Sequence, residues 1–344
     1  TGMYLEQKLN PESRMYNLIG FYQVSGAAAQ QIKEAVEDIF RSHEAFHSVY
    51  REKNGKLIRV LVDEIPSVTI QQTDDISSVP ELAEALDKTY DLSGGIPVSA
   101  VVYTDGEKSV LALLYHHIMF DGGSDVIFSR ELLARLSGST PAADSFDLSG
   151  ASLEDKEDEY RSGLEKYRTL FADGVPVTEL PLKGSRPKVH PESDTDRFFV
   201  ISGDMLNDLK QAARRKSVTV FDLLLSAYSM TAAKYTVSDD IVISVPVNTR
   251  NGNTHNTIGM FVNNALLRLK PLRTKMADEY ISEVKEAVSE YIKETSCPFD
   301  RLVSEFSGSR DESRSLLADL GINYIPVQNA FSENGVTLNT SYRL

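Results

Sequence analysis

Two adjacent histidines, His116 and His117, are followed by Asp121 and Gly122 at the end of the apolar run 110–115. A neutral imidazole can accept a proton or a hydrogen bond from an attacking amine or hydroxyl near neutral pH. A carboxylate four residues later can fold back across the turn, to orient a ring or to pair with a base elsewhere. Gly122 would allow a sharp turn and could bring its N–H near a reacting carbonyl oxygen. These four residues are therefore the candidate catalytic group, and the chemistry they suggest is acyl transfer.

The strand that should carry the two histidines gives them different surroundings, because neighbouring side chains on a strand point to opposite faces. We expect His117 to look into a cleft as the catalytic residue, as a base or by orienting the amine, and His116 to be structural. Asp121 is expected to anchor the loop in an ion pair. Ser124 either caps the helix that follows or reaches the site.

The overall charge excludes several classes of partner. The 344 residues include 36 Lys and Arg and 50 Asp and Glu, so the formal net charge is −14. Nucleic acids and anionic membranes both require a basic surface, so neither is an expected partner. Cys297 is the single cysteine, and no His, Asp and Glu set has ligand spacing, so no metal site is expected. With no signal peptide or membrane span recognised, a cytoplasmic location is expected.

Hydrophobic spacing predicts helices that alternate with strands, an α/β pattern. A proline-containing stretch at 172–196 predicts the crossover between two lobes, which we place at 1–175 and 176–344. Asn54-Gly55 predicts a hairpin. The expected helices are at 27–40, 80–90, 124–138, 153–171, 204–215, 219–235, 276–293 and 299–306, and the expected strands are at 46–51, 57–62, 96–103, 108–115, 197–201, 240–246 and 258–269.

Several separated segments repeat the ordered motifs of one known family. The matching segments are Ser42–Phe46 for RHExL, His116–Gly122 for HHxxxDG, Ile258–Asn263 for IGxFVN with Arg268 at the place of an expected arginine, Pro298–Asp300 for PFE, and Arg310–Arg314 for RDxSR. In this order they resemble the condensation domain of nonribosomal peptide synthetases. HHxxxDG alone is shared by many acyltransferases, so the resemblance depends on the ordered set.

The resemblance implies the two-lobed chloramphenicol-acetyltransferase-like fold, with mixed sheets, helices on one side of each, and an active site in a tunnel between the lobes. It implies amide-bond formation between a donor acyl or peptidyl thioester and the amine of an acceptor aminoacyl thioester. Both would arrive on the phosphopantetheine arms of carrier proteins, so the domain would bind no cofactor itself. An adjacent adenylation domain is the other implied partner.

The resemblance also assigns residues outside the histidine motif. It places Asn263 and Arg268 on a second-lobe strand facing the tunnel, with Ser124 near the substrate. Arg310 and Asp311 are expected to form a local salt bridge that holds this lobe together. In the family, the sequence HQD precedes PFE, and here residues 294–296 differ from it. The given sequence also ends soon after the RDxSR segment, so we expect the second lobe to be incomplete.

One departure leaves the partner of Asp121 open. His47 stands where the family has an arginine that pairs with the motif aspartate, so Arg250, Arg41, Arg51 or a protonated His47 could take that place. Three functional alternatives also stay open: a stand-alone acyltransferase that uses coenzyme A, an epimerisation-type domain, and a non-catalytic condensation-like domain that recruits other proteins. A heterocyclisation domain is disfavoured because that subfamily replaces the histidine pair with aspartates.

Overall fold

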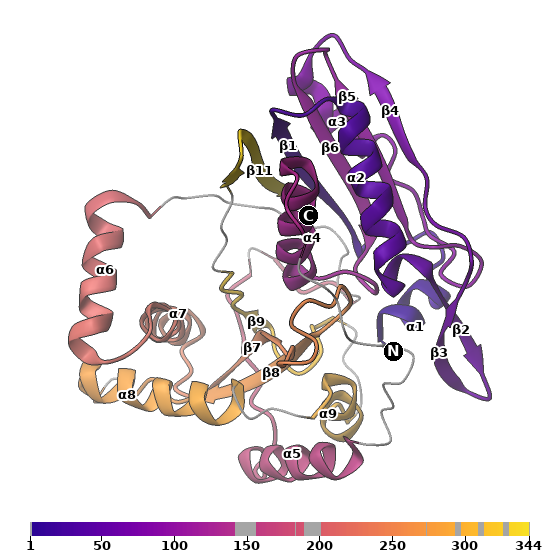
Figure 1. Cartoon of the computed structure of the whole chain (residues 1–344). Helices are drawn as coiled ribbons and strands as arrows, with labels where there is room; N and C mark the ends of the chain where they lie inside the picture. Colours follow the sequence, from indigo (N-terminus) through magenta and orange to yellow (C-terminus); the bar gives the residue numbers. More distant parts are fainter. Residues whose placement is uncertain are drawn as a thin grey trace. The chain divides into compact units, whose positions relative to one another are not determined.

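The structure is a computed structural model that describes residues 2–141, 156–182, 184–188, 201–272, 274–292, 297–308, 313–325 and 330–343. The chain forms two compact units, each built from separate stretches of sequence (Figure 1). Unit 1 comprises Thr1–Ala151, Asn248–Phe261 and Ile325–Leu344, and unit 2 comprises Ser152–Val247 and Val262–Tyr324. These units differ from the lobes 1–175 and 176–344, because the two later segments of unit 1 place Ile258, Phe331 and Leu338 in its core.

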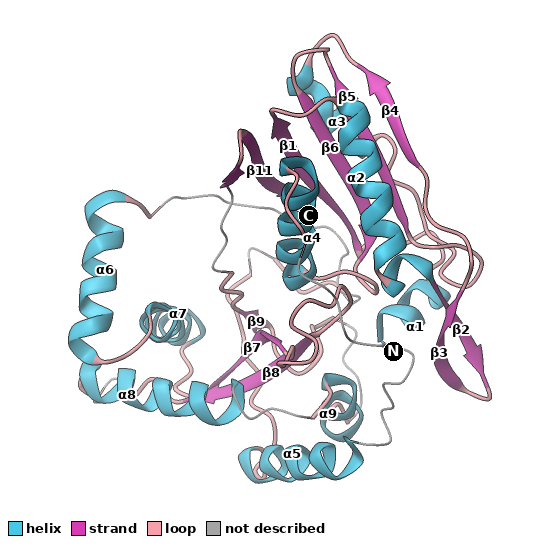
Figure 2. Ribbon diagram, viewed as in Figure 1, coloured by secondary structure: helices cyan, strands magenta, loops and turns pink. Residues whose placement is uncertain are grey.

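A six-stranded mixed sheet forms the centre of unit 1 (Figure 2). Its strand order is β10-β11-β1-β6-β5-β4, and only the pairing of β4 with β5 is parallel among these described strands. The bounds are β1 (Asn17–Ser25), β4 (Val68–Gln72), β5 (Val98–Thr104), β6 (Ser109–His116), β10 (Ala330–Glu333) and β11 (Val336–Arg343).

Helices cover both faces of this sheet, and not one side only as expected. Leu111 and Leu113 of β6 join the cluster that includes α2 (Ala29–Ser42) and α4 (Gly122–Ser137), while Ala112 and Leu114 join the cluster that includes α3 (Val79–Glu84). A strand buried on both faces has a continuous apolar sequence instead of an alternating one. This explains the unbroken run that leads to the histidines.

The predicted hairpin is confirmed. β2 (Ser48–Lys53) pairs with β3 (Lys56–Leu61), and the two turn residues between them have φ values of 53° at Asn54 and 73° at Gly55. Positive φ at both positions is the geometry that favours Asn-Gly in a two-residue hairpin turn. The remaining helices of unit 1 are α1 (Gly2–Leu9) and the 3-10 helices η1 (Glu44–His47) and η2 (Ile76–Ser78).

Unit 2 has a three-stranded sheet of order β8-β7-β9, with helices on both faces. Ile241 and Ile243 of β7 pack in the cluster of α7 and α8, whereas Val242 packs in the cluster of α5 and α9. The bounds are α5 (Glu157–Leu170), α6 (Gly203–Lys216), α7 (Val220–Thr236), β7 (Ile241–Asn248), β8 (Val262–Leu269), α8 (Ala277–Ala287) followed by the π-helix η5 (Val288–Ile292), α9 (Phe299–Phe306) and β9 (Leu320–Gly321).

Most predicted elements are confirmed near their expected places. The helix expected over 80–90 ends at Glu84, and α4 begins two residues before Ser124. The strand expected over 258–269 begins only at Val262, because 258–261 packs with unit 1 instead. β1, β4, β9, β10 and β11 were not predicted. The strand expected at 197–201 lies almost wholly outside the described residues.

Candidate active site

The candidate residues of the histidine motif lie in the turn between β6 and α4. β6 ends at His116 and α4 begins at Gly122. Asp121 is the N-cap of α4, and its Oδ1 accepts the backbone N–H of Ser124 at 2.8 Å. A carboxylate at this position satisfies one of the free N–H groups of the helix and interacts favourably with its positive end. The motif acid therefore fixes where the turn stops and the helix starts.

His117 is half-buried, and one of its ring nitrogens is held by the turn. Its Nδ1 lies 2.8 Å from the carbonyl oxygen of Phe120. A carbonyl can only accept, so Nδ1 must carry the proton, and in the neutral ring Nε2 is then the nitrogen with a free lone pair. The backbone N–H of His117 also donates to the carbonyl of Tyr16, at 2.7 Å. The geometry thus presents Nε2 as a base or hydrogen-bond acceptor.

His116 has a different environment. Its side chain is fully buried, and its Nδ1 accepts the backbone N–H of Ile118 at 3.0 Å. Its proton is therefore on Nε2, which has no hydrogen-bond partner within the part of the chain that the structure describes. Burial, and to a smaller degree His117, lowers the pKa of His116 to about 4. The ring is neutral at physiological pH, as a structural residue would be.

The partner of Asp121 is Arg250. Arg250 Nη2 lies 2.8 Å from Oδ1 of Asp121, and Arg250 Nη1 lies 2.9 Å from Oδ2, so the pair is bidentate. Oδ2 also accepts the backbone N–H of Phe261 at 2.8 Å. The Asp121 side chain is fully buried and that of Arg250 is 6% exposed. Because both carboxylate oxygens have several donors, Asp121 is an anchor and has no free oxygen with which to act as a base.

Two of the other candidate partners of Asp121, Arg41 and Arg51, are engaged elsewhere. Arg41 pairs with Asp38 on its own helix, at 2.6 Å. Arg51 donates from Nε to the carbonyl of Ser93 at 3.1 Å. His47 is half-buried at the end of η1. The arginine missing at position 47 is thus replaced by one about 200 residues later in the chain.

The guanidinium of Arg250 is fixed within the 248–261 segment as well. Nε donates to the carbonyl of Thr257 at 3.2 Å, and Nη2 donates to the carbonyl of Gly259 at 3.1 Å. The guanidinium carbon lies 4.6 Å from the centroid of the Phe261 ring, within range of a cation–π interaction. A planar group with several rigid donors is suited to this many partners at once.

Ser124 links the start of α4 to the same segment. Its hydroxyl accepts the backbone N–H of Gly259 at 2.9 Å, and lies 2.8 Å from the Gly259 carbonyl and 2.9 Å from Asp121 Oδ1, either of which can receive its proton. The helix cap is Asp121 rather than Ser124. The backbone N–H and the hydroxyl of Ser124 are therefore both occupied. The N–H is bonded to Asp121, and the hydroxyl is bonded to the backbone of Gly259 in the IGxFVN segment.

The close-packed glycine at the start of α4 is Gly123, the residue after the motif, and not Gly122. A Cβ at Gly122 would meet nothing within 4 Å, and Gly122 does not have a positive φ. A Cβ at Gly123 would lie 2.9 Å from Cζ of Arg250. Gly259 is restricted too, since a Cβ there would lie 2.9 Å from the ring of Phe261. Gly123 carries no signal in the sequence, because only the folded chain brings a guanidinium to that helix turn.

Asn263 and Arg268 lie on β8 in unit 2, and both side chains are occupied within that unit. Asn263 donates from Nδ2 to the Cys297 carbonyl at 2.8 Å and accepts the Phe299 N–H on Oδ1 at 2.9 Å. Its amide therefore joins the start of α9 to β8.

Arg268 is held by three groups. It donates to Asp240 through Nε at 2.9 Å and Nη2 at 2.6 Å, to Asp173 through Nη2 at 2.9 Å, and to the carbonyl of Leu170 through Nη1 at 2.8 Å. The hydrogen bonds to Asp240 and Asp173 raise the pKa of Arg268. The guanidinium therefore connects the end of α5 to Asp240, the residue before β7, and each of its three nitrogens donates a hydrogen bond.

Two expected site residues, Arg310 and Asp311, lie outside the described residues, as does the 294–296 segment. Arg314, from the same RDxSR segment, pairs with Asp319 at 2.7 Å and with Glu179. This part of the motif is thus engaged in ion pairs within unit 2.

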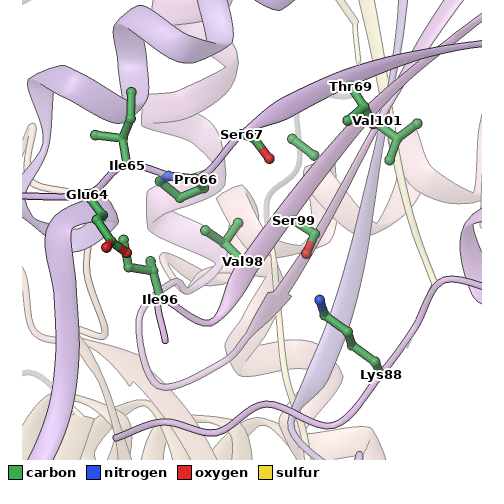
Figure 3. A pocket seen from close by; sticks show the side chains of 11 residues that line it. Glu64, Ile65, Pro66, Ser67, Thr69, Lys88, Ile96, Val98, Ser99 and Val101 are labelled. Carbon is green, nitrogen blue, oxygen red and sulfur yellow. The ribbon is translucent and has the colours of Figure 1, made fainter. Parts of the chain in front are cut away.

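A hollow in unit 1 is lined by none of the candidate site residues. It has a volume of about 380 Å³ and lies between the starts of β4 and β5; Figure 3 shows Ser67, Ser99 and Lys88 among the side chains that line it. In the described ranges, no three His, Cys, Asp or Glu side chains are grouped as a metal site. None of the helices described is both long and apolar enough to span a membrane.

Comparison with curated proteins finds peptide synthetases. The chain is 26% identical over 333 residues to bacitracin synthase 3 of Bacillus licheniformis, covering 92% of this chain and 5% of that protein. It is also 26% identical over 334 residues to tyrocidine synthase 3 of Brevibacillus parabrevis, with the same two coverages. The chain therefore spans a small fraction of the length of these relatives.

Solved structures share the fold at lower identity. The four-domain nonribosomal peptide synthetase holo-AB3403 superposes with a TM-score of 0.82 at 19% identity, covering 98% of this chain and 28% of that one. The first condensation domain of the calcium-dependent antibiotic synthetase, in complex with a substrate analogue, gives 0.81 at 19% identity, covering 99% and 82%. The X-domain in its complex with OxyB from teicoplanin biosynthesis gives 0.78 at 17% identity, covering 100% and 79%.

These likenesses confirm the predicted α/β fold of the chloramphenicol-acetyltransferase type. The family model named "Condensation domain" matches residues 1–342. The chain therefore belongs to the condensation-domain family of the nonribosomal peptide synthetases.

Proposed function

We propose that this chain forms an amide bond between a donor acyl or peptidyl thioester and the α-amine of an acceptor aminoacyl thioester. The observation that carries the proposal is the state of His117, whose Nδ1 is committed to the Phe120 carbonyl and whose Nε2 is left as the basic nitrogen of a half-buried ring. A nitrogen of this kind suits an attacking amine, because it can accept the proton that the amine must lose.

The proposed step balances without a further reagent. The amine nitrogen attacks the thioester carbonyl carbon, and Nε2 of His117 takes the amine proton as the C–N bond forms. The C–S bond then breaks, and the imidazolium returns that proton to the departing thiolate. A thioester is already an activated donor, so holding two reactants in line supplies much of the acceleration, up to about 7–11 kcal/mol for ideal alignment.

The remaining motif residues support this step indirectly. The Asp121–Arg250 pair fixes the turn that holds His117, and it is buried where water cannot compete. The N–H of Gly122, the exposed first residue of α4, is the proposed donor to the oxyanion, because the first N–H groups of a helix are not used within it.

The family sets the expected partners. Since curated relatives are peptide synthetases many times longer than this chain, we infer that the donor and acceptor arrive on carrier domains as phosphopantetheine thioesters. The pantetheine arm is then part of each substrate, with no resident cofactor required. An adenylation domain that loads the acceptor carrier completes the proposed set of partners.

The test is a single-turnover assay with two carrier domains loaded with different amino acids, read by mass spectrometry of the acceptor carrier. We expect dipeptidyl carrier from the parent chain, and a fall of 10²–10⁴-fold for His117→Ala if proton transfer is its role. His255→Ala is the matched control, because His255 is exposed in the 248–261 segment and takes no part in the step. Equal rates for His117→Ala and the parent would exclude the catalytic role of that ring.

The same assay separates the alternatives. Product formed from a coenzyme A thioester but not from a loaded carrier would favour a stand-alone acyltransferase. Inversion of an amino acid on one carrier would favour an epimerisation-type domain. Because a partner-bound X-domain shares this fold, tight binding of a partner protein without any product would favour recruitment.

A further inference from the structure

A second buried carboxylate lies one helical turn beyond Asp121, and the proposed mechanism does not use it. Asp125 is 3% exposed, and its carboxylate accepts a hydrogen bond from the hydroxyl of Tyr22, which is fully buried on β1. The backbone N–H of Asp125 donates to the carbonyl of Asp121 at 3.1 Å. Asp121 and Asp125 therefore hold the same helix start on two sides, through Arg250 and through Tyr22.

The surroundings of Asp125 are aromatic. The rings of Tyr22 and Phe128 are 5.1 Å apart, and those of Tyr115 and Phe120 are 4.5 Å apart. Burying a carboxylate among rings is unfavourable unless hydrogen bonds compensate it. An apolar residue at 125 would pack α4 against the sheet without this penalty, so simple stability does not explain the choice of an acid.

Strand β1 connects this carboxylate to His117. Near the start of the strand, the carbonyl of Tyr16 accepts the N–H of His117 at 2.7 Å, and further along the hydroxyl of Tyr22 donates to Asp125. His117, at one end of the turn, is thus tied to the residue before β1, and the first turn of α4, beyond the other end, is tied to β1 itself. A directional hydrogen bond to a charged acceptor fixes how far α4 can rotate or slide, which ring packing alone does not do.

We propose that Tyr22 and Asp125 are positioning residues that keep the His117 ring in the orientation which exposes Nε2. The proposal deepens the amide-forming role argued above and rests on it. Neither side chain touches the reactants. Both act through the turn 117–121, by holding α4 in register with β1.

Titration gives this arrangement a pH signature. Burial raises the pKa of Asp125 to about 6, although the hydrogen bond from Tyr22 opposes the shift. The ionisable groups that interact with Asp125 include Tyr22 on β1 and Tyr115 on β6, and Asp121 lies one helical turn earlier in the chain. His43, the C-cap of α2, pairs with Glu131 on α4, more than one turn beyond Asp125. As pH falls through 6, the acceptor becomes neutral, so its hydrogen bond weakens and the turn is held less firmly.

Three variants test the proposal in the carrier-loaded assay. Tyr22→Phe removes the donor, and we expect kcat to fall about tenfold while KM for each carrier changes less than twofold. Asp125→Asn keeps the acceptor but cannot ionise, so we expect a smaller fall, about threefold at pH 7.5, and a shallower decline of kcat than in the parent as pH falls through 6. Ser129→Ala is the control, because this buried α4 hydroxyl has no partner among the described residues and should change neither quantity.

A second readout does not depend on catalysis. Long-range ¹H–¹⁵N spectra report the tautomer of each histidine ring, and we expect His117 to be protonated on Nδ1 in the parent and in Ser129→Ala. In Tyr22→Phe we expect a mixture of tautomers. Unchanged His117 signals together with an unchanged rate per folded molecule would overturn the positioning role, even if melting temperature falls. Altered signals in a chain that forms no product would instead count against the proposed function alone.

Discussion

Arg250 and Asp121 are 129 residues apart in the sequence, yet they form a buried, bidentate ion pair at the start of α4. The sequence did not determine the partner of Asp121, because His47 stands at the position of the expected arginine, and the structure shows that this partner is Arg250. The pair also ties the 248–261 segment to the histidine turn, since Phe261 and Ser124 share the same carboxylate. The site therefore depends on a contact between segments that are distant along the chain.

Removing Arg250 should strongly destabilise unit 1. In Arg250→Ala the buried carboxylate of Asp121 loses its counter-charge, and a broken buried pair typically costs about 3–5 kcal/mol. Urea unfolding measures this change. Arg41→Ala is the control, because its partner Asp38 is exposed, and exposed pairs contribute about 0–1 kcal/mol. Similar losses in the two variants would contradict the structural role assigned to Arg250.

Gly122 and Gly123 should respond differently to the same substitution. Gly123→Ala places a methyl group against the Arg250 guanidinium, which cannot move without losing its hydrogen bonds, so we expect about 1–3 kcal/mol of destabilisation. Gly122→Ala has open space and should be neutral or slightly stabilising, because alanine favours the helix. Denaturation midpoints compare the two. A larger effect at 122 than at 123 would be inconsistent with this packing.

His116 should make folding sensitive to acid. Its pKa is about 4 in the folded chain and 6.5 in the reference state, so the unfolded chain binds more protons between these values and stability falls as pH falls. Between pH 7.5 and pH 5 this residue alone contributes a loss of about 2 kcal/mol. His116→Asn keeps an acceptor for the Ile118 N–H but cannot titrate.

The measurement is the free energy of unfolding of both proteins at the two pH values. Asp125 titrates in the same range with the opposite sign, because its pKa is raised to about 6, but both proteins retain it and its effect cancels. We expect the difference between the parent and His116→Asn to shift in favour of the variant by about 2 kcal/mol at pH 5. A pH-independent difference would mean that the ring is accessible to protonation in the folded chain.

Arg268 should stabilise unit 2 without taking part in the reaction. Arg268→Lys keeps the charge but cannot reach Asp240, Asp173 and the Leu170 carbonyl together, so we expect a loss of about 1–3 kcal/mol. Under conditions where the variant is folded, its rate in the carrier-loaded assay should stay within about twofold of the parent. A much lower rate in a fully folded variant would indicate that Arg268 takes part in substrate binding or in the reaction.

Local patterns in the sequence were sufficient for most elements and for the identity of the motif. The apolar run before His116 predicted a buried strand, and Asn54-Gly55 predicted the hairpin, since both depend on residues close together in the chain. Ile258–Phe261 was misassigned to a strand. Its apolar residues fit a buried strand equally well, and the hydrogen bonds that hold its backbone come from Ser124 and Asp121.

The sequence by itself determined the family, the α/β elements and the residues of the histidine motif, because these follow from residue type and short-range spacing. The tertiary structure alone decided that Arg250 pairs with Asp121, that Gly123 needs to be a glycine, and which nitrogen of His117 carries the proton. Each of these depends on atoms brought together by folding, either across more than a hundred residues or across a turn whose exact path is set by its neighbours. Spacing along a chain cannot specify such distances, since they are fixed by packing and by hydrogen bonds between distant segments.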